Sequence, residues 1–179
     1  IEHVTTVAER ALQYADHYGL TNNDKKIIRK VSLLHDAYDH KYVKDSEKIK
    51  RRINRDLRKQ ECKENEIYLI HNIIDNISFS KEKKNRDKRY PSKKVITFRD
   101  PHQQLMRDIV SDADKYEAIG DMAVIRMIEF YNSKNKDCED KFSENWYKKF
   151  IDHLKKHSEE KLFKLISDNY IRTSIGKKE

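Results

Sequence analysis

The sequence contains little glycine, proline or cysteine. Only three Gly and two Pro interrupt 179 residues, which argues against a disordered chain even though the mean hydropathy is −1.03. Two cysteines, Cys62 and Cys138, are too few for a disulfide framework and lack the spacing of a zinc site, so reduced surroundings are expected. No apolar run approaches the roughly 18 residues of a membrane span, and no signal peptide is visible. We therefore expect a cytoplasmic protein without a membrane partner.

Charge and helical periodicity are what the sequence has in abundance. Charged residues make up 39% of the chain, and Ile, Leu and Val recur at helical spacing between them. The length fits one domain with a core of its own, so we predict a single-domain, all-α protein over residues 1–179. The chain begins at Ile1 without a Met, and its natural N-terminus is expected to lie upstream.

The pattern places the expected elements along the chain. A helix that begins within Thr21–Asp24 ends at His35, and another begins at Asp100-Pro101, where Asp caps and Pro occupies the first helical position. A brief strand is predicted at Val95–Phe98. Further helices are predicted over residues 1–18, 45–60, 64–77 and 121–131, and two more between Trp146 and Ile166.

Much of the net charge of +8 lies in one segment. Residues 81–99 hold nine Lys or Arg and two acids, and we predict a basic inserted loop there. Such a loop steers phosphates or binds nucleic acid, or else it is only a solvated insertion. The sequence leaves these readings open.

Two histidines and two aspartates form a candidate metal site. His35-Asp36 ends a helical run, and His3 and Asp114 each lie four residues from an apolar position of their own helices. Adjacent helical residues point about 100° apart, so one ion reaches both His35 and Asp36 only near the helix end. Imidazole nitrogens and carboxylate oxygens together suit a first-row divalent ion such as Mn²⁺, Fe²⁺ or Zn²⁺.

The order of these residues resembles the HD superfamily of metal-dependent phosphohydrolases. The likeness is greatest to its small single-domain subgroup, some members of which hydrolyse nucleoside triphosphates to monophosphate and pyrophosphate. It rests on segments in the family's order: His3–Ala11, Leu33–Tyr42, Asn76–Lys81, Asp112–Gly120, Glu160–Leu165 and Arg172-Thr173.

The resemblance implies a helical HD-fold bundle holding one divalent metal. Mn²⁺ is favoured, with Fe²⁺, Zn²⁺, Ni²⁺ or Co²⁺ as alternatives. The implied ligands are His3, His35, Asp36 and Asp114, with a metal-bound water as nucleophile. Asp112 competes for the last position, but the family's ligand is followed by a basic or bulky residue, as Asp114 is.

The other implied roles concern protons and phosphate. Asp39 would manage the proton near the attacking water, or be only a turn residue. Lys115 would neutralise a phosphoryl oxygen, or pair with Glu117. Weaker candidates for contacts with phosphate, from loops at the same end, are Ser80, Lys81, His40 and Lys41.

The resemblance therefore implies a metal-dependent phosphohydrolase whose partner is a phosphorylated small molecule, most simply a nucleotide. One alternative is a phosphomonoesterase or phosphodiesterase acting on another metabolite. The other is a nucleic-acid-binding protein on an HD scaffold, which would use residues 81–99 and bind with a steep salt dependence. The sequence does not indicate an oligomeric state.

Overall fold

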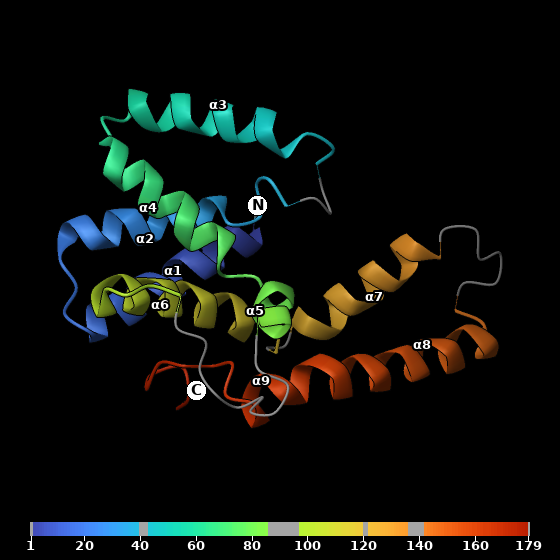
Figure 1. Cartoon of the computed structure of the whole chain (residues 1–179). Coiled ribbons are helices and arrows are strands. Elements are labelled where there is room, and N and C mark those ends of the chain that lie inside the picture. The colour runs from blue at the N-terminus through green and yellow to red at the C-terminus, as the bar shows by residue number, and fades with distance from the viewer. Residues whose placement is uncertain (1, 40–42, 86–96, 120–121, 136–141, 179) are drawn as a thin grey trace.

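The computed structural model describes residues 2–39, 43–85, 97–119, 122–135 and 142–178. Within these residues the chain is helical and contains no strand, which confirms the predicted single-domain, all-α class (Figure 1). The helices are α1 (Glu2–His17), α2 (Asn22–Leu34), α3 (Ser46–Lys59), α4 (Glu64–Asp75), α5 (Phe79–Asn85), α6 (Pro101–Glu117), α7 (Met122–Lys134), α8 (Glu144–His157) and α9 (Phe163–Ser167).

Helices α1 and α2 form a hairpin whose turn is set by local chemistry. Gly19 follows α1 with a φ of 63°, a left-handed conformation that suits glycine at the end of a helix. Thr21 then caps α2 in a capping box with Asp24: the Asp24 N–H donates to the Thr21 hydroxyl, and Asp24 accepts from the Thr21 N–H. The predicted start of this helix is thereby confirmed.

Helix α6 is the centre of the core. Its Met106, Ile109, Val110 and Ala113 are at most 1% exposed, and the helix packs against α1 and α2. Helix α4 covers α2, and α3 lies outside α4 at the edge of the molecule (Figure 1). The first turn of α1, the end of α2 and the last turns of α6 are therefore held against one apolar core.

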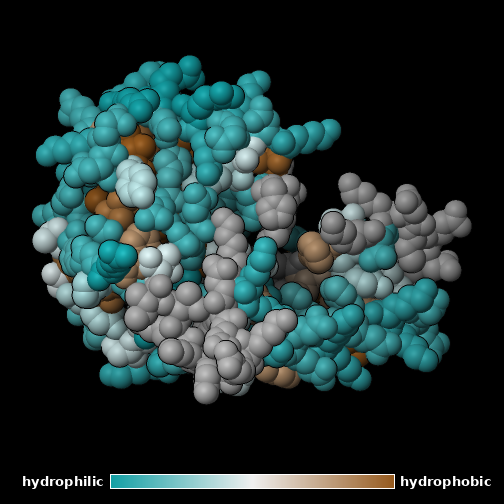
Figure 2. Space-filling view, viewed as in Figure 1, coloured by the Kyte–Doolittle hydropathy of each residue, from teal (hydrophilic) through white to brown (hydrophobic). Residues whose placement is uncertain are grey.

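Helices α7 and α8 extend away from this body (Figure 1). An aromatic cluster joins them: Trp146 stacks on Phe150 at 5.2 Å, and Tyr131 meets both rings edge-on. A π-helical turn, Ser158–Leu162, connects α8 to α9. The surface in Figure 2 is largely hydrophilic, as the high charge content predicts. No helix among the described residues is long and apolar enough to cross a membrane.

The segment 81–99 differs from the prediction at its start. Residues 81–85 belong to helix α5 and not to a loop, because Glu82 is buried and paired with cations from elsewhere in the chain. Residues 86–96 lie outside the described residues. Of the predicted strand, Thr97 and Phe98 are irregular, and their N–H groups donate to the side-chain oxygen of Gln104.

Candidate metal centre

Three helices of the core bring together His3, His35 and Asp114. His3 lies in the first turn of α1, His35 directly follows α2, and Asp114 lies in the last turns of α6. Asp114 Oδ1 is 3.3 Å from His3 Nε2 and 3.5 Å from His35 Nε2. One donor atom from each of the three lies within 4.8 Å of the others, which is close enough for a single ion to meet all three.

Asp36 lies beside the same two histidines. Its Oδ2 is 3.5 Å from His35 Nε2 and 4.0 Å from His3 Nε2. His35 and Asp36 reach one place because α2 has ended before them, so the chain turns there. The four predicted ligands therefore meet, with Asp36 on the more exposed side.

The orientation of His35 is fixed by its own helix. Its Nδ1 lies 2.6 Å from the Ser32 carbonyl oxygen and donates to it, which leaves Nε2 facing the carboxylates. This Nε2 is buried, makes no well-aligned hydrogen bond, and lies 3.5 Å from a carboxylate oxygen of Asp36 and of Asp114. A histidine that donates one ring N–H to a carbonyl and aims its other nitrogen at a polar cluster is the usual arrangement of a metal ligand.

The charges of the cluster favour a bound cation. Burial opposes the charged form of His35, but the carboxylates of Asp114 and Asp36 outweigh burial and raise its pKa to about 9. Burial would likewise raise the pKa of Asp114, yet the ring nitrogens of His3 and His35 beside its carboxylate lower it. In the metal-free protein a proton on His35 thus supplies the positive charge that the two carboxylates attract.

The donor set fits a first-row divalent ion. Two imidazole nitrogens and two carboxylate oxygens form the mixed N/O set that suits Mn²⁺, Fe²⁺ or Zn²⁺. The buried Nε2 of His35 faces both carboxylates without a well-aligned hydrogen bond, an arrangement that a cation between them would satisfy. Of the four proposed ligands only the His35 side chain is buried, and the partly exposed side chains of His3, Asp36 and Asp114 leave room for water or substrate.

Asp112, the competitor for the last ligand position, lies elsewhere. It is 1% exposed, and its Oδ2 accepts from the N–H groups of Arg172 and Thr173 at 2.9 and 2.6 Å. Asp112 therefore anchors the C-terminal segment to α6, and Asp114 is the carboxylate at the histidines.

The structure corrects the prediction for Lys115. Its ammonium is buried, and it donates to Glu82, to the Ser111 hydroxyl and to the Tyr170 carbonyl at 2.8–3.2 Å. It faces neither the metal cluster nor Glu117, which lies 3.8 Å from Arg10. Lys115 follows Asp114 by one residue, and the 100° between successive helical residues turns it to another face of α6.

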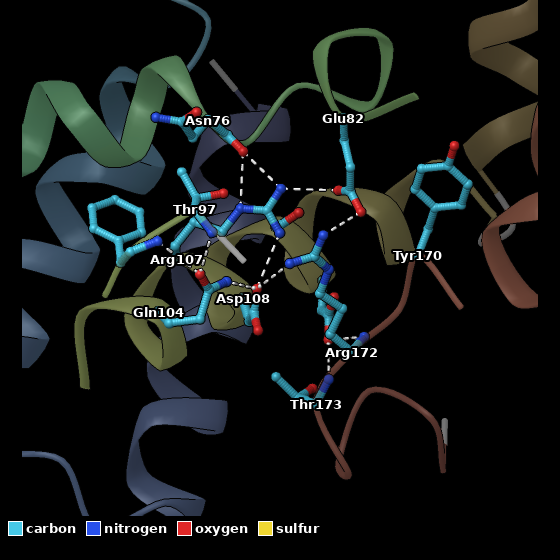
Figure 3. A network of polar contacts seen from close by, with 12 residues as sticks. Asn76, Glu82, Thr97, Gln104, Arg107, Asp108, Tyr170, Arg172 and Thr173 are labelled. Atoms are coloured by element: carbon cyan, nitrogen blue, oxygen red, sulfur yellow. Dashed lines mark hydrogen bonds and ion pairs between the residues drawn. The ribbon is translucent and has the colours of Figure 1, made fainter. Parts of the chain in front are cut away.

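That other face carries a buried network of charges, shown in Figure 3. Arg107 donates to Glu82, to Asp108 and to the Asn76 carbonyl. Arg172 pairs with Glu82 and Asp108 from the C-terminal segment. The network joins α5, α6 and the C-terminal segment. It is not apparent in the sequence, because Glu82 stands there as one acid within a basic run.

The remaining predicted site residues are placed only in part. Asp39 lies half-buried in the turn after α2, where its N–H donates to the Asp36 carbonyl at 3.3 Å. Ser80 is exposed in the first turn of α5. His40 and Lys41 lie outside the described residues, and so does the side chain of Lys81.

A second group supports the turn that carries Asp36 and Asp39. The hydroxyl of Tyr38 lies 3.1 Å from His71 Nδ1, and His71 Nε2 donates to Asn54 Oδ1. Burial and the charge of Lys50 lower the pKa of His71, which keeps it neutral and able to accept from Tyr38. His71 therefore connects the turn to α3 and α4. The position of His71 in the sequence of α4 does not indicate that Tyr38 is its partner.

Comparison with known proteins identifies relatives of the fold. No protein-family model and no curated protein matches the chain. The crystal structure of Bacillus subtilis YpgQ superposes with a TM-score of 0.64 and 19% identity, over 98% of this chain and 76% of YpgQ. The chain has the fold of YpgQ. A structural-genomics target from Lactobacillus plantarum matches with a TM-score of 0.68 and 22% identity, over 99% of this chain and 76% of that protein. At such identities the likeness shows the fold alone.

Proposed function

We propose that this chain is an HD-type, metal-dependent phosphohydrolase that acts on a nucleotide. The observation that carries the proposal is the cluster of His3, His35 and Asp114, whose donor atoms lie within 4.8 Å of one another. Asp36 beside them completes the His…His-Asp…Asp set on which the family resemblance rests. The substrate class rests on the resemblance to the subgroup that includes nucleoside triphosphate pyrophosphohydrolases.

Each residue of the cluster has a chemical task in this proposal. A divalent ion held there would supply Lewis-acid chemistry, by lowering the pKa of water and polarising a phosphoryl oxygen. His3 and His35 would hold it through neutral nitrogens, and the Ser32 carbonyl keeps the His35 ring in the required orientation. Asp36 and Asp114 would neutralise its charge.

Asp39 handles the proton of the reaction. It lies half-buried in the turn that follows Asp36, about one helical turn beyond that ligand. A carboxylate at this position accepts a proton from the attacking water and returns it to the leaving oxygen. Lys115 has no part in this scheme, because its ammonium is bonded within the buried network.

The test combines metal analysis with product analysis. We expect the purified protein to bind about one divalent ion and, with Mn²⁺, to release pyrophosphate from a nucleoside triphosphate. Asp36→Ala removes a proposed ligand and should reduce turnover by at least about 100-fold. Asp56→Ala, an exposed acid on α3, is the matched control and should retain wild-type turnover.

The products distinguish the alternatives. Orthophosphate released from the triphosphate, or turnover only on monoesters or diesters, would replace the pyrophosphohydrolase version with another phosphohydrolase. If the protein bound no metal and turned over no nucleotide, the proposal as a whole would be overturned.

A further inference from the structure

Lys30 and Cys62 form a contact that neither the fold nor the metal cluster explains. Lys30 Nζ of α2 lies 2.6 Å from the Sγ of Cys62, which precedes α4 by two residues. Both side chains are half-buried, and Cys62 also packs against the edge of the core. The two nucleophiles, an amine and a thiol, thus meet across a junction between separate elements.

Their separation does not correspond to an ordinary hydrogen bond. An N–H···O hydrogen bond is already about 2.9 Å long, and sulfur is a larger acceptor than oxygen. A spacing of 2.6 Å is therefore too short for N–H···S, and it is too long for a direct S–N bond. A single oxygen atom, at ordinary S–O and O–N bond lengths and angle, spans this gap.

We propose that Lys30 and Cys62 are an oxidative modification site at which dioxygen supplies a bridging oxygen atom, giving an Nζ–O–Sγ link. The thiol adds dioxygen, so that an S–O bond forms and the thiol hydrogen moves to the distal oxygen. The Lys30 amine then attacks the sulfur-bound oxygen. The N–O bond forms as the O–O bond breaks, and the departing hydroxide takes a proton from nitrogen as water.

Electrons and atoms balance in this sequence. Sulfur and nitrogen each lose two electrons, and dioxygen gains four, with one oxygen atom in the link and one in water. Excess dithiothreitol supplies the four electrons and four protons that restore the amine and the thiol and release the bridging oxygen as water. The link is therefore reversible.

The link would join α2 to the connection between α3 and α4, beside the place where α2 packs against α4. Lys30 lies five residues before His35 on the same chain segment, and Cys62 lies in the connection between α3 and α4. A covalent tie between them fixes the α3–α4 pair against the helix that ends at the metal cluster. It closes a loop of the unfolded chain, so the linked protein should also resist urea better than the reduced protein.

The experiment is high-resolution intact mass measurement of the folded, full chain before and after incubation in oxygen-saturated buffer. We expect a species that has gained one oxygen and lost two hydrogens, and that returns to the original mass with dithiothreitol. Peptide mapping should join the peptides that contain Lys30 and Cys62. Cys138→Ser should retain the link, whereas Lys30→Arg and Cys62→Ser should each abolish it. The same incubation in urea, which separates the pair, should give none.

Several results would overturn the proposal. One is a product in which the Cys62 sulfur has gained oxygen atoms and Lys30 is unmodified. Loss of two hydrogens without a gained oxygen would indicate a direct S–N bond instead. An unchanged mass, or a mass change that persists in Lys30→Arg, would equally contradict it. None of these outcomes bears on the phosphohydrolase proposal, which is tested by metal content and turnover.

Discussion

His35 is both the most constrained residue of the metal cluster and the one that a proton occupies when metal is absent. Its pKa of about 9 means that the metal-free protein holds that proton at neutral pH, and metal must displace it. We expect the affinity for Mn²⁺ to rise about tenfold per pH unit between pH 6 and 8. Competition titration against a chromophoric chelator at three pH values measures this slope. Asp114→Asn removes the main cause of the raised pKa of His35. In this variant Mn²⁺ should bind more weakly, and its affinity should rise less steeply with pH. A wild-type affinity that does not change with pH would contradict the assignment of His35.

Substitution of Lys115 distinguishes a structural role for this residue from a catalytic one. Replacing it by Met keeps the length of the side chain but removes the ammonium that bonds Glu82, Ser111 and Tyr170. We expect Lys115→Met to lower the free energy of unfolding by about 3 kcal/mol, because a buried carboxylate loses a partner. Urea unfolding measures the loss, and metal stoichiometry should stay at the wild-type value. If the variant had unchanged stability and bound metal but had lost turnover, Lys115 would have a catalytic role after all.

At the scale of elements, α5 depends on one buried side chain. Glu82 is 4% exposed and meets Arg107, Lys115 and Arg172, whereas its neighbour Lys83 is exposed. Glu82→Gln leaves three cations with too little negative charge, and we expect a loss of about 3–5 kcal/mol of stability with faster amide exchange throughout α5. Lys83→Gln, on the same helix, is the control and should change stability by less than about 0.5 kcal/mol. Equal effects of the two substitutions would contradict the role of the network.

The helices show which information is local in the sequence and which is not. The bounds of α1, α2, α3 and α6 follow from apolar periodicity and from capping residues such as Thr21 and Asp100. Both signals depend only on residues within a few positions of the helix end. The formation of α5 depends on Arg107 and Arg172, which are 25 and 90 residues from Glu82, so no local pattern reveals it.

The candidate site divides in the same way. Three of its members lie where their helical spacing predicts, because a residue four positions from a buried one shares its face. Adjacency in sequence was misleading for Lys115, since the residue after a helical ligand points to a different face. The support of Tyr38 by His71 and Asn54 depends on α3 and α4 packing beside the turn, which periodicity alone does not specify.

Across the whole molecule, α6 lies between two polar clusters of different kinds. On one face Asp114 joins histidines from α1 and α2, and on another Arg107, Asp108 and Lys115 hold α5 and the C-terminal segment. In the second cluster the carboxylates of Glu82 and Asp108 pair with the cations of Arg107, Lys115 and Arg172. In the first, two carboxylates face the ring nitrogens of two histidines, so its contribution to stability depends on whether a proton or a metal ion lies between them.

Metal should therefore stabilise the whole fold, and most strongly at alkaline pH. In the metal-free protein the raised pKa of His35 adds stability that is fully present below about pH 6.5 and is lost as the pH rises through about 9, by about 3 kcal/mol at most. Metal binding strengthens over the same range because the proton leaves. At 100 times its dissociation constant, Mn²⁺ should add about 2.7 kcal/mol.

Thermal unfolding at pH 6.5 and 8.5, with Mn²⁺ or with a chelator, measures both effects. We expect the gap between the melting temperatures with metal and with chelator to widen at the higher pH in the wild-type protein. In Asp114→Asn, which should bind metal more weakly, the gap should be smaller and should change less with pH. Because the ligands come from α1, α6 and the end of α2, a bound ion ties the three helices that build the core. If metal left the melting temperature unchanged at both pH values, the side chains of His3, His35, Asp36 and Asp114 would not form a metal site.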